Sequence, residues 1–242
     1  MQSSSPSSGS YPAAPGTYNL TTQTATGESV QYTLRIPAQY DGHSQLPVLL
    51  CLHFGGQATA FYGRTFLHLI PVPGLGDLPA FFVAPTTHNG DWTAPEGEAV
   101  VWSALQAVEQ ALPVDTSRRV VMGYSLGGIG TWHFATAFRE RFVAAIPMAS
   151  APRRANPEAA RDLPLYVIHS QVDRILPIAD DEAAVKRLRE LGAPVQFAAL
   201  PQGDHFDYRL VITELQQNVA DWLTHLWEPN TAGGRRPLGG SQ

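Results

Sequence analysis

The chain has 242 residues, of which 44% are hydrophobic and 15% are charged, and its formal net charge is −5. This composition suits one large α/β core and excludes an intrinsically disordered protein. No run of more than two consecutive basic residues is present, and the pair Arg235 and Arg236 lies in the C-terminal tail. This disfavours a nucleic-acid partner, and no apolar stretch reaches the length of a membrane span.

The two ends of the chain differ in composition from its middle. Residues 1–15 are rich in Ser, Pro and Gly, and residues 229–242 are rich in Gly, as is typical of flexible tails. We therefore expect one domain over residues 16–228. The first residues lack the basic and apolar regions of a signal peptide, and both a cytoplasmic location and export with removal of a leader stay open.

The pattern of apolar residues predicts alternating strands and helices. Residues 17–24 and 30–36 alternate polar and apolar side chains, which predicts an antiparallel hairpin with one wet face. Six further apolar runs of strand length follow at residues 48–52, 80–84, 120–124, 142–148, 165–169 and 194–200. Helices are expected over residues 60–70, 96–112, the segment after residue 125, 179–191 and 208–226.

This order predicts an α/β fold built on a mostly parallel eight-stranded sheet, with an antiparallel N-terminal edge and helices on both faces. Pro71, Pro73, Gly74 and Gly76 predict an irregular loop after the first helix. Only some sixteen residues separate Met148 from Leu165, too few for a lid domain at that place. Ligands of such sheets bind at the carboxyl ends of the strands.

One of these strand ends carries the motif Gly-x-Ser-x-Gly, from Gly123 to Gly127. An apolar strand precedes it and helix formers follow it, which is the context of a nucleophile elbow with the hydroxyl of Ser125 exposed. A serine needs a base within hydrogen-bond reach and a third group to orient that base. His205 and Asp173 both follow predicted strands, and the chain order Ser, Asp, His is that of an α/β-hydrolase triad.

Other histidines and acids have weaker contexts. His133 and His225 fall within predicted helices, His43, His68 and His88 follow no strand, and His169 is expected to be buried and structural. Asp180 and Asp181 are expected to be solvated in the first turn of a helix. Asp204 is too close to His205 in sequence to orient it, and Asp207 is expected to cap a helix.

An oxyanion hole requires two preset N–H donors. One is expected from Leu126, the residue after the nucleophile. The other is expected from the loop after the strand that ends at Leu52, either Gly55 or Phe54. The alternative for that loop is an ordinary glycine turn.

Four segments in this order resemble motifs of the α/β-hydrolase superfamily: Leu52–Gly56, Gly123–Gly128, His169–Pro177 and His205. The resemblance is to its small, capless serine carboxylesterases, which include dienelactone-hydrolase-like, phospholipase/carboxylesterase-like and feruloyl- or polyhydroxybutyrate-esterase-like enzymes. Phe54 and Ser170 stand where the family usually has glycine. By alignment of the first motif, Gly55 is the preferred second oxyanion donor.

The sequence thus predicts a serine esterase that works through an acyl-enzyme, without a metal or an organic cofactor. An open cleft is expected for short-chain or aromatic esters or for a segment of a polymeric ester. Its expected walls are Phe54, Trp92, Tyr124, Ile175 and Phe206. A peptidase or amidase with the same triad and a non-catalytic binding module are the alternatives, and the oligomeric state stays open.

Overall fold

The structure is a computed structural model that describes residues 11–87 and 90–228. Most of the two predicted tails and His88 lie outside these ranges. Residues 11–15 lead directly into the sheet, and the hydroxyl of Tyr11 hydrogen-bonds to that of Tyr32 at 3.1 Å. Among the described residues, no helix is both long enough and apolar enough to cross a lipid bilayer.

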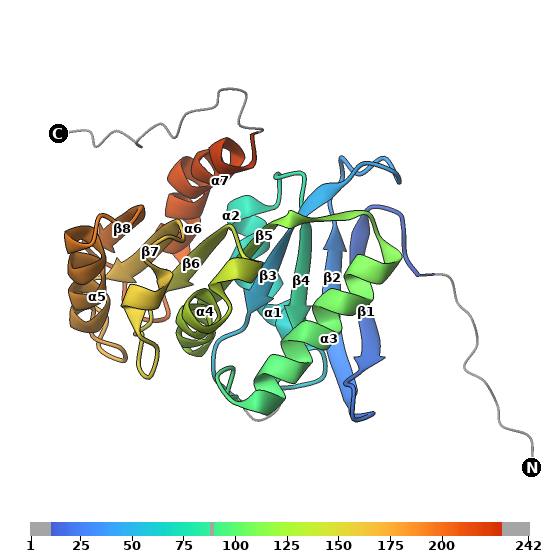
Figure 1. Cartoon of the computed structure of the whole chain (residues 1–242), viewed down its shortest axis with the longest axis horizontal. Helices are drawn as coiled ribbons and strands as arrows, with labels where there is room; N and C mark the ends of the chain where they lie inside the picture. Colours follow the sequence, from blue (N-terminus) through green and yellow to red (C-terminus); the bar gives the residue numbers. More distant parts are fainter. Residues whose placement is uncertain (1–10, 88–89, 229–242) are drawn as a thin grey trace, which may run out of the picture.

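Eight strands form a single sheet (Figure 1). The strands are β1 (Gly16–Gln23), β2 (Ser29–Ile36), β3 (Leu46–Leu52), β4 (Phe81–Pro85), β5 (Val114–Tyr124), β6 (Ala144–Met148), β7 (Leu165–Ser170) and β8 (Val195–Leu200). Their order is β1-β2-β4-β3-β5-β6-β7-β8, with β1, β2 and β4 paired antiparallel and the other neighbours parallel. This confirms the predicted sheet and its antiparallel edge.

The helices cover both faces of the sheet. They are α1 (Tyr62–Leu69), α2 (Pro71–Leu75), α3 (Pro95–Ala111), α4 (Leu126–Ala137), α5 (Ala179–Glu190), α6 (Arg209–Glu214) and α7 (Ala220–Trp227). The π-helical turn η3 (Leu215–Val219) joins α6 to α7, and two short 3-10 helices are η1 (Arg139–Arg141) and η2 (Pro157–Ala160). Residues 149–164, between β6 and β7, are fully described and contain η2 but no inserted domain.

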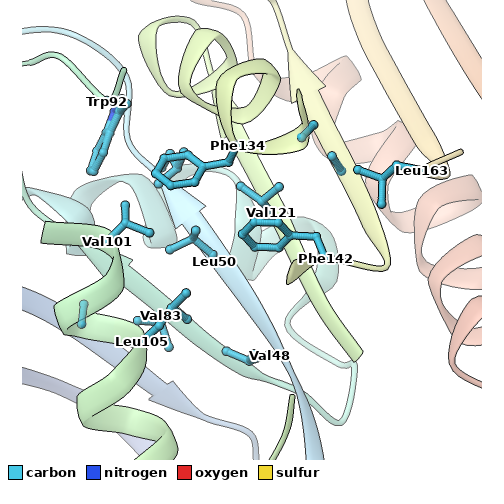
Figure 2. Packing of buried hydrophobic residues seen from close by; sticks show 14 of the residues in the cluster. Val48, Leu50, Val83, Trp92, Val101, Leu105, Val121, Phe134, Phe142 and Leu163 are labelled. Atoms are coloured by element: carbon cyan, nitrogen blue, oxygen red, sulfur yellow. The ribbon is translucent and has the colours of Figure 1, made fainter. Parts of the chain in front are cut away.

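Successive side chains of each strand point to opposite faces of the sheet, and the apolar ones form two layers, one on each side of the sheet. Val48 and Leu50 face α3, α4 and α5, whereas Leu49 and Cys51 face α1, α2, α6 and α7. Figure 2 shows the first layer, where Leu50 of β3 lies near Phe134 of α4. Each large side chain buried in this way stabilises the fold by about 1.5–3 kcal/mol, so the sheet holds its strand ends in fixed positions.

The prediction of an irregular loop at residues 71–76 is wrong, because α2 forms there. Pro71 occupies one of the first two positions of α2, and a proline in the first turn removes only an N–H that has no partner in the helix. Gly74 lies against η3, where a Cβ would stand 2.7 Å from the Cβ of Leu215. The prolines and glycines therefore allow a short helix that packs closely.

Candidate active site

Ser125 lies on a sharp turn between β5 and α4. Its φ is 56° and its ψ is −117°, a conformation rare for any residue except glycine. The turn is fixed by its backbone, since the N–H of Ser125 donates to the carbonyl of Met148 at 2.9 Å. A Cβ on Gly127 would overlap the carbonyl of Leu52, and one on Gly123 would overlap the carbonyl of Gly127. Both glycines of the motif are thus required by the close approach of α4 to β3 and β5.

The strain at Ser125 leads to a stability prediction. We expect Ser125→Gly to be more stable than Ser125→Ala by about 1 kcal/mol, because glycine adopts this φ and ψ without strain. Both variants lose the hydroxyl, so only the backbone distinguishes them. Urea unfolding of the two variants measures the difference, and equal stabilities would show that the turn holds no strain.

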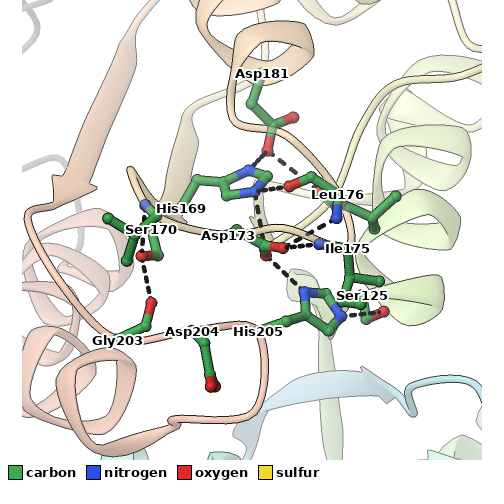
Figure 3. A network of polar contacts seen from close by, with 12 residues as sticks. Ser125, His169, Ser170, Asp173, Ile175, Leu176, Asp181, Gly203, Asp204 and His205 are labelled. Atoms are coloured by element: carbon green, nitrogen blue, oxygen red, sulfur yellow. Dashed lines mark hydrogen bonds and ion pairs between the residues drawn. The ribbon is translucent and has the colours of Figure 1, made fainter.

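Ser125, His205 and Asp173 form one hydrogen-bonded chain (Figure 3). Nε2 of His205 lies 2.8 Å from Oγ of Ser125, and Nδ1 of His205 lies 2.6 Å from Oδ2 of Asp173. A carboxylate only accepts, so Nδ1 carries the proton and Nε2 is free to accept from the serine hydroxyl. Each residue comes from a loop at the carboxyl end of a strand, namely β5, β7 and β8.

The loop that follows β7 orients Asp173. Its other oxygen, Oδ1, accepts hydrogen bonds from the backbone N–H groups of Ile175 at 2.8 Å and Leu176 at 2.9 Å. Burial alone would raise the pKa of Asp173, but these bonds and the one from His205 hold that pKa below its usual value. Asp173 is therefore a carboxylate at neutral pH. Ser170, in place of the usual glycine, ties this loop to the loop after β8 by donating to the carbonyl of Gly203 at 2.5 Å.

Behind Asp173 lies a second buried histidine, His169. Its Nε2–H donates to the carbonyl of Leu176 at 2.8 Å and lies 3.5 Å from Oδ2 of Asp173. Its Nδ1 lies 2.8 Å from Oδ2 of Asp181. Burial lowers the pKa of His169, but Asp181, Leu176 and Asp173 together raise it above the usual value. His169 is buried, as expected, and it bonds to a loop carbonyl and lies between two carboxylates.

The expectation that Asp181 is solvated is wrong. Its side chain is fully buried, and its Oδ1 accepts from Nε1 of Trp132 at 2.9 Å. The signal in the sequence is helical periodicity, since residue 181 shares a face with the buried Ala184, Val185 and Leu188. Asp181 thus joins α5 to α4 and β7 through polar contacts inside the core.

The His169 contacts predict a pH-dependent stability. A histidine whose pKa is raised on folding stabilises the protein fully below its unfolded pKa of 6.5, and this contribution is lost as the pH rises through the folded pKa. The free energy of unfolding should therefore differ more between wild type and His169→Gln at about pH 6 than at about pH 9. Asp173 and Asp181 are the charged groups that face the ring. A difference that is independent of pH would mean that His169 carries no charge.

The prediction that Trp92 and Tyr124 line the cleft is wrong, because both side chains are buried. Trp92 is 0% exposed, and its Nε1 donates to the carbonyl of His53 at 3.0 Å, so it supports the loop after β3 from within the core. Tyr124 is 3% exposed, and its hydroxyl donates to the carbonyl of His205 at 2.9 Å. Tyr124 therefore supports the loop of His205 and offers almost no surface to a substrate.

The other three expected walls lie at the surface of the site. Ile175 is 58% exposed and Phe206 is 68% exposed, and the ring of Phe206 packs edge-on against His205 with centroids 5.4 Å apart. Phe54 is half-buried and stacks on Tyr208 at 6.1 Å. A role in substrate binding for these three residues stays a prediction.

The loop after β3 brings Gly55 next to Leu126, the residue that follows Ser125. A Cβ on Gly55 would lie 3.7 Å from the Cβ of Leu126, so the loop and the first turn of α4 face each other. His53 holds this loop, because its Nδ1 donates to the carbonyl of Phe54 at 2.8 Å while its Nε2 accepts from the N–H of Thr87 at 3.2 Å. Sequence reasoning missed this role, although His53 is part of the motif Leu52–Gly56.

The remaining histidines lie apart from this chain of contacts. His133 pairs with Glu98 at 2.7 Å on the surface of α4, and Nδ1 of His225 lies 2.6 Å from the carbonyl of Asp221 on α7. Both positions agree with the helix faces expected from the sequence.

Curated proteins that resemble part of the chain carry the name of an esterase. The chain is 29% identical over 153 residues to "Probable feruloyl esterase C" from Aspergillus terreus, an alignment that covers 61% of this chain and 56% of that protein. It is 28% identical over 152 residues to the protein of the same name from Aspergillus niger, with the same coverage. The chain thus spans about half the length of the curated relatives that it matches. No family model matches the sequence.

Solved structures share the fold over most of the chain. A thermostable esterase superimposes with a TM-score of 0.75 at 21% identity, covering 86% of this chain and 62% of that one. A ferulic acid esterase gives a TM-score of 0.69 at 18% identity, covering 88% of this chain and 100% of that one. S-formylglutathione hydrolase from Staphylococcus aureus gives 0.68 at 18% identity, covering 89% and 99%. With its strand order, its elbow and these neighbours, the chain has the α/β-hydrolase fold.

Proposed function

We propose that this protein is a serine esterase that cleaves carboxylic esters through an acyl-enzyme. The observation that carries the proposal is the continuous chain from Oγ of Ser125 to Nε2 of His205 at 2.8 Å and from Nδ1 of His205 to Asp173 at 2.6 Å. A histidine with a structural role alone would not need the half-buried elbow serine as its partner. The feruloyl esterase relatives agree with this class of reaction.

The first half of the reaction forms the acyl-enzyme. Oγ of Ser125 attacks the ester carbonyl carbon while Nε2 of His205 takes its proton, and the carbonyl oxygen becomes an oxyanion. The imidazolium then gives that proton to the leaving alkoxide, and the C–O bond of the ester breaks. In the second half, water attacks the acyl carbon, His205 takes a proton from the water, and the acid leaves as Ser125 regains its hydrogen.

The backbone around Ser125 suits stabilisation of the oxyanion. The N–H of Leu126 is the first of α4, whose positive dipole end faces the serine. Gly55 lies on the facing loop, next to Leu126, and its N–H is the second donor of the proposal. Loss of one such donor typically costs about 2.7–4 kcal/mol of transition-state stabilisation.

Asp173 acts through His205. Its carboxylate fixes the Nδ1–H tautomer and stabilises the imidazolium that forms when the serine loses its proton. The two backbone N–H groups and His169 hold Asp173 in its charged form from the opposite side. Asp173 is thus a positioning residue that meets no substrate atom.

The open site and the feruloyl esterase relatives together favour short-chain or aromatic acyl groups. The test is a panel of matched esters with acetyl, butyryl, long-chain acyl and feruloyl groups, and a feruloyl amide beside the feruloyl ester. We expect turnover of the short and the feruloyl esters and slow turnover of the amide. Turnover of the amide alone would favour a peptidase or amidase, and turnover of long-chain triglycerides alone would contradict the open site.

A further inference from the structure

A cavity of about 600 Å³ opens directly beside the candidate oxyanion site. This volume lies within the range of pockets that hold small organic molecules. One of its walls is a face of α4 formed by Leu126, Ile129 and His133, which follow one another at helical spacing. The other walls are Gly90, Asp91 and Thr93, and the turn after β6, residues 152–155. Leu126 thus belongs both to the candidate oxyanion site and to the lining of this cavity, so a substrate bound at Ser125 can place one arm there.

The near part of the cavity is apolar. Leu126, Ile129 and Pro152 line it, and they offer no charged group. His133 lies seven positions after Leu126 on α4, which corresponds to a rise of roughly 10 Å along the helix axis at 1.5 Å per residue. This length suits an extended alkyl chain or an aromatic ring with a substituent.

Two adjacent arginines, Arg153 and Arg154, line the cavity from the turn after β6. The turn is closed by the N–H of Ala155, which donates to the carbonyl of Pro152 at 2.8 Å. Arg153 has a φ of 53°, a left-handed conformation that glycine or asparagine would adopt at lower cost. A charged side chain thus occupies a strained turn position at this cavity, and such outliers concentrate at functional sites.

The charges around the two arginines do not cancel. Neither guanidinium forms an ion pair within 4 Å of any acidic residue that the structure describes. Asp91 is the acidic residue in the cavity lining, and its Oδ1 accepts from the N–H and the hydroxyl of Thr93 at 2.8 Å and 2.7 Å. His133 pairs with Glu98. The two arginines therefore give the cavity lining one more positive charge than Asp91 neutralises.

We propose that this cavity is a subsite for an anionic substrate arm, so that the preferred esters carry a carboxylate or a similar anion at the end of an apolar acyl or alcohol group. Arg153 and Arg154 bind the anion and thereby determine specificity, and Leu126, Ile129 and Pro152 contact the apolar part. Arginine suits this role because its planar guanidinium donates two parallel hydrogen bonds to a carboxylate. The inference rests on the proposed esterase function of Ser125.

Two pairs of esters test the subsite. One pair is the 4-nitrophenyl monoester of suberic acid and its methyl ester, which differ in charge at the end of the acyl arm. The other is 4-carboxybenzyl butyrate and its methyl ester, which differ in charge at the end of the alcohol arm. For each pair we define the preference ratio as kcat/KM for the carboxylate ester divided by kcat/KM for its methyl ester. Comparing this ratio between variants cancels the intrinsic reactivity of the esters.

The variants are R153Q/R154Q, both single changes, and R189Q as the matched control, since Arg189 is an exposed arginine on α5 outside the cavity. For the arm that enters the cavity, we expect the ratio to fall about tenfold or more in R153Q/R154Q and to stay unchanged in R189Q. Hydrolysis of 4-nitrophenyl butyrate by R189Q should stay within about twofold of wild type, because Arg189 lies outside the cavity. Added salt should lower the wild-type ratio.

Equal ratios in wild type and R153Q/R154Q for both pairs would overturn the subsite. Should the double variant lose butyrate hydrolysis, the single variants carry the same comparison. Failure of the esterase function itself can be distinguished from failure of the subsite. Calorimetric titration of Ser125→Ala with each ester measures binding without hydrolysis. Tighter binding of the carboxylate esters, lost in Ser125→Ala combined with R153Q/R154Q, would support the subsite even if wild type hydrolysed no ester. Equal binding of charged and neutral esters would contradict it.

Discussion

Replacing Ser125 by Ala is expected to lower kcat for ester hydrolysis by about 10⁵- to 10⁶-fold, because no other group in the proposed mechanism can form the acyl-enzyme. The hydroxyl is the partner of Nε2 of His205 at 2.8 Å. Alanine retains the Cβ and the same backbone, so folding should be unchanged. The measurement is steady-state hydrolysis of 4-nitrophenyl butyrate together with a thermal unfolding curve.

Ser103→Ala is the matched control, since Ser103 lies on α3, outside the hydrogen-bonded chain. It should leave kcat unchanged. A Ser125→Ala protein that kept a tenth of the wild-type rate, free of contaminating esterase, would contradict the assignment of the nucleophile. Loss of activity together with loss of the folded state would instead contradict the claim that the hydroxyl has no structural role.

The second large effect is expected on stability. Asp181→Ala should lower the free energy of unfolding by about 3–5 kcal/mol, because it breaks a buried pair and leaves Nδ1 of His169 without its closest carboxylate. The same change removes the acceptor of Nε1 of Trp132, and a buried donor without a partner adds to the cost. Urea unfolding at neutral pH measures the loss.

Asp180→Ala is the control for this change, because Asp180 is exposed and precedes Asp181 on the same helix turn. It should change the free energy of unfolding by no more than about 0.5 kcal/mol. If the two variants were equally stable, the polar contacts around His169 would contribute nothing to the fold. A combined Asp181→Asn and His169→Gln variant should recover part of the loss, since it replaces both ionisable groups of the pair by neutral amides.

The sequence predicts the sheet well, because six of its strands contain continuous apolar runs that can be recognised without knowledge of their neighbours in the fold. The run from Val48 to Leu52 needs no partner to be recognised as a buried strand, and its pairing with β5 brings its end beside the elbow. The same logic explains why Ser125, Asp173 and His205 could be selected together, since each follows such a run.

Side-chain directions in loops could not be predicted in this way. Trp92 and Tyr124 stand next to strand ends, like Phe206, yet their polar atoms bond to carbonyls in the interior whereas Phe206 remains exposed. The end of an apolar run predicts where a loop begins, but it does not predict whether an aromatic side chain of that loop packs into the core or remains exposed. The turn of Arg153 and Arg154 was missed for the same reason, because its place beside α4 depends on tertiary packing.

Covalent labelling of Ser125 tests the central claim most directly. Folded protein at about pH 8 is incubated with a fluorophosphonate, and the adduct is measured by intact mass and located by peptide mapping. The account predicts one adduct per chain, on Ser125, with labelling greatly slowed in His205→Ala and absent in Ser125→Ala. Absence of labelling in folded wild-type protein, or an adduct on another residue, would contradict it.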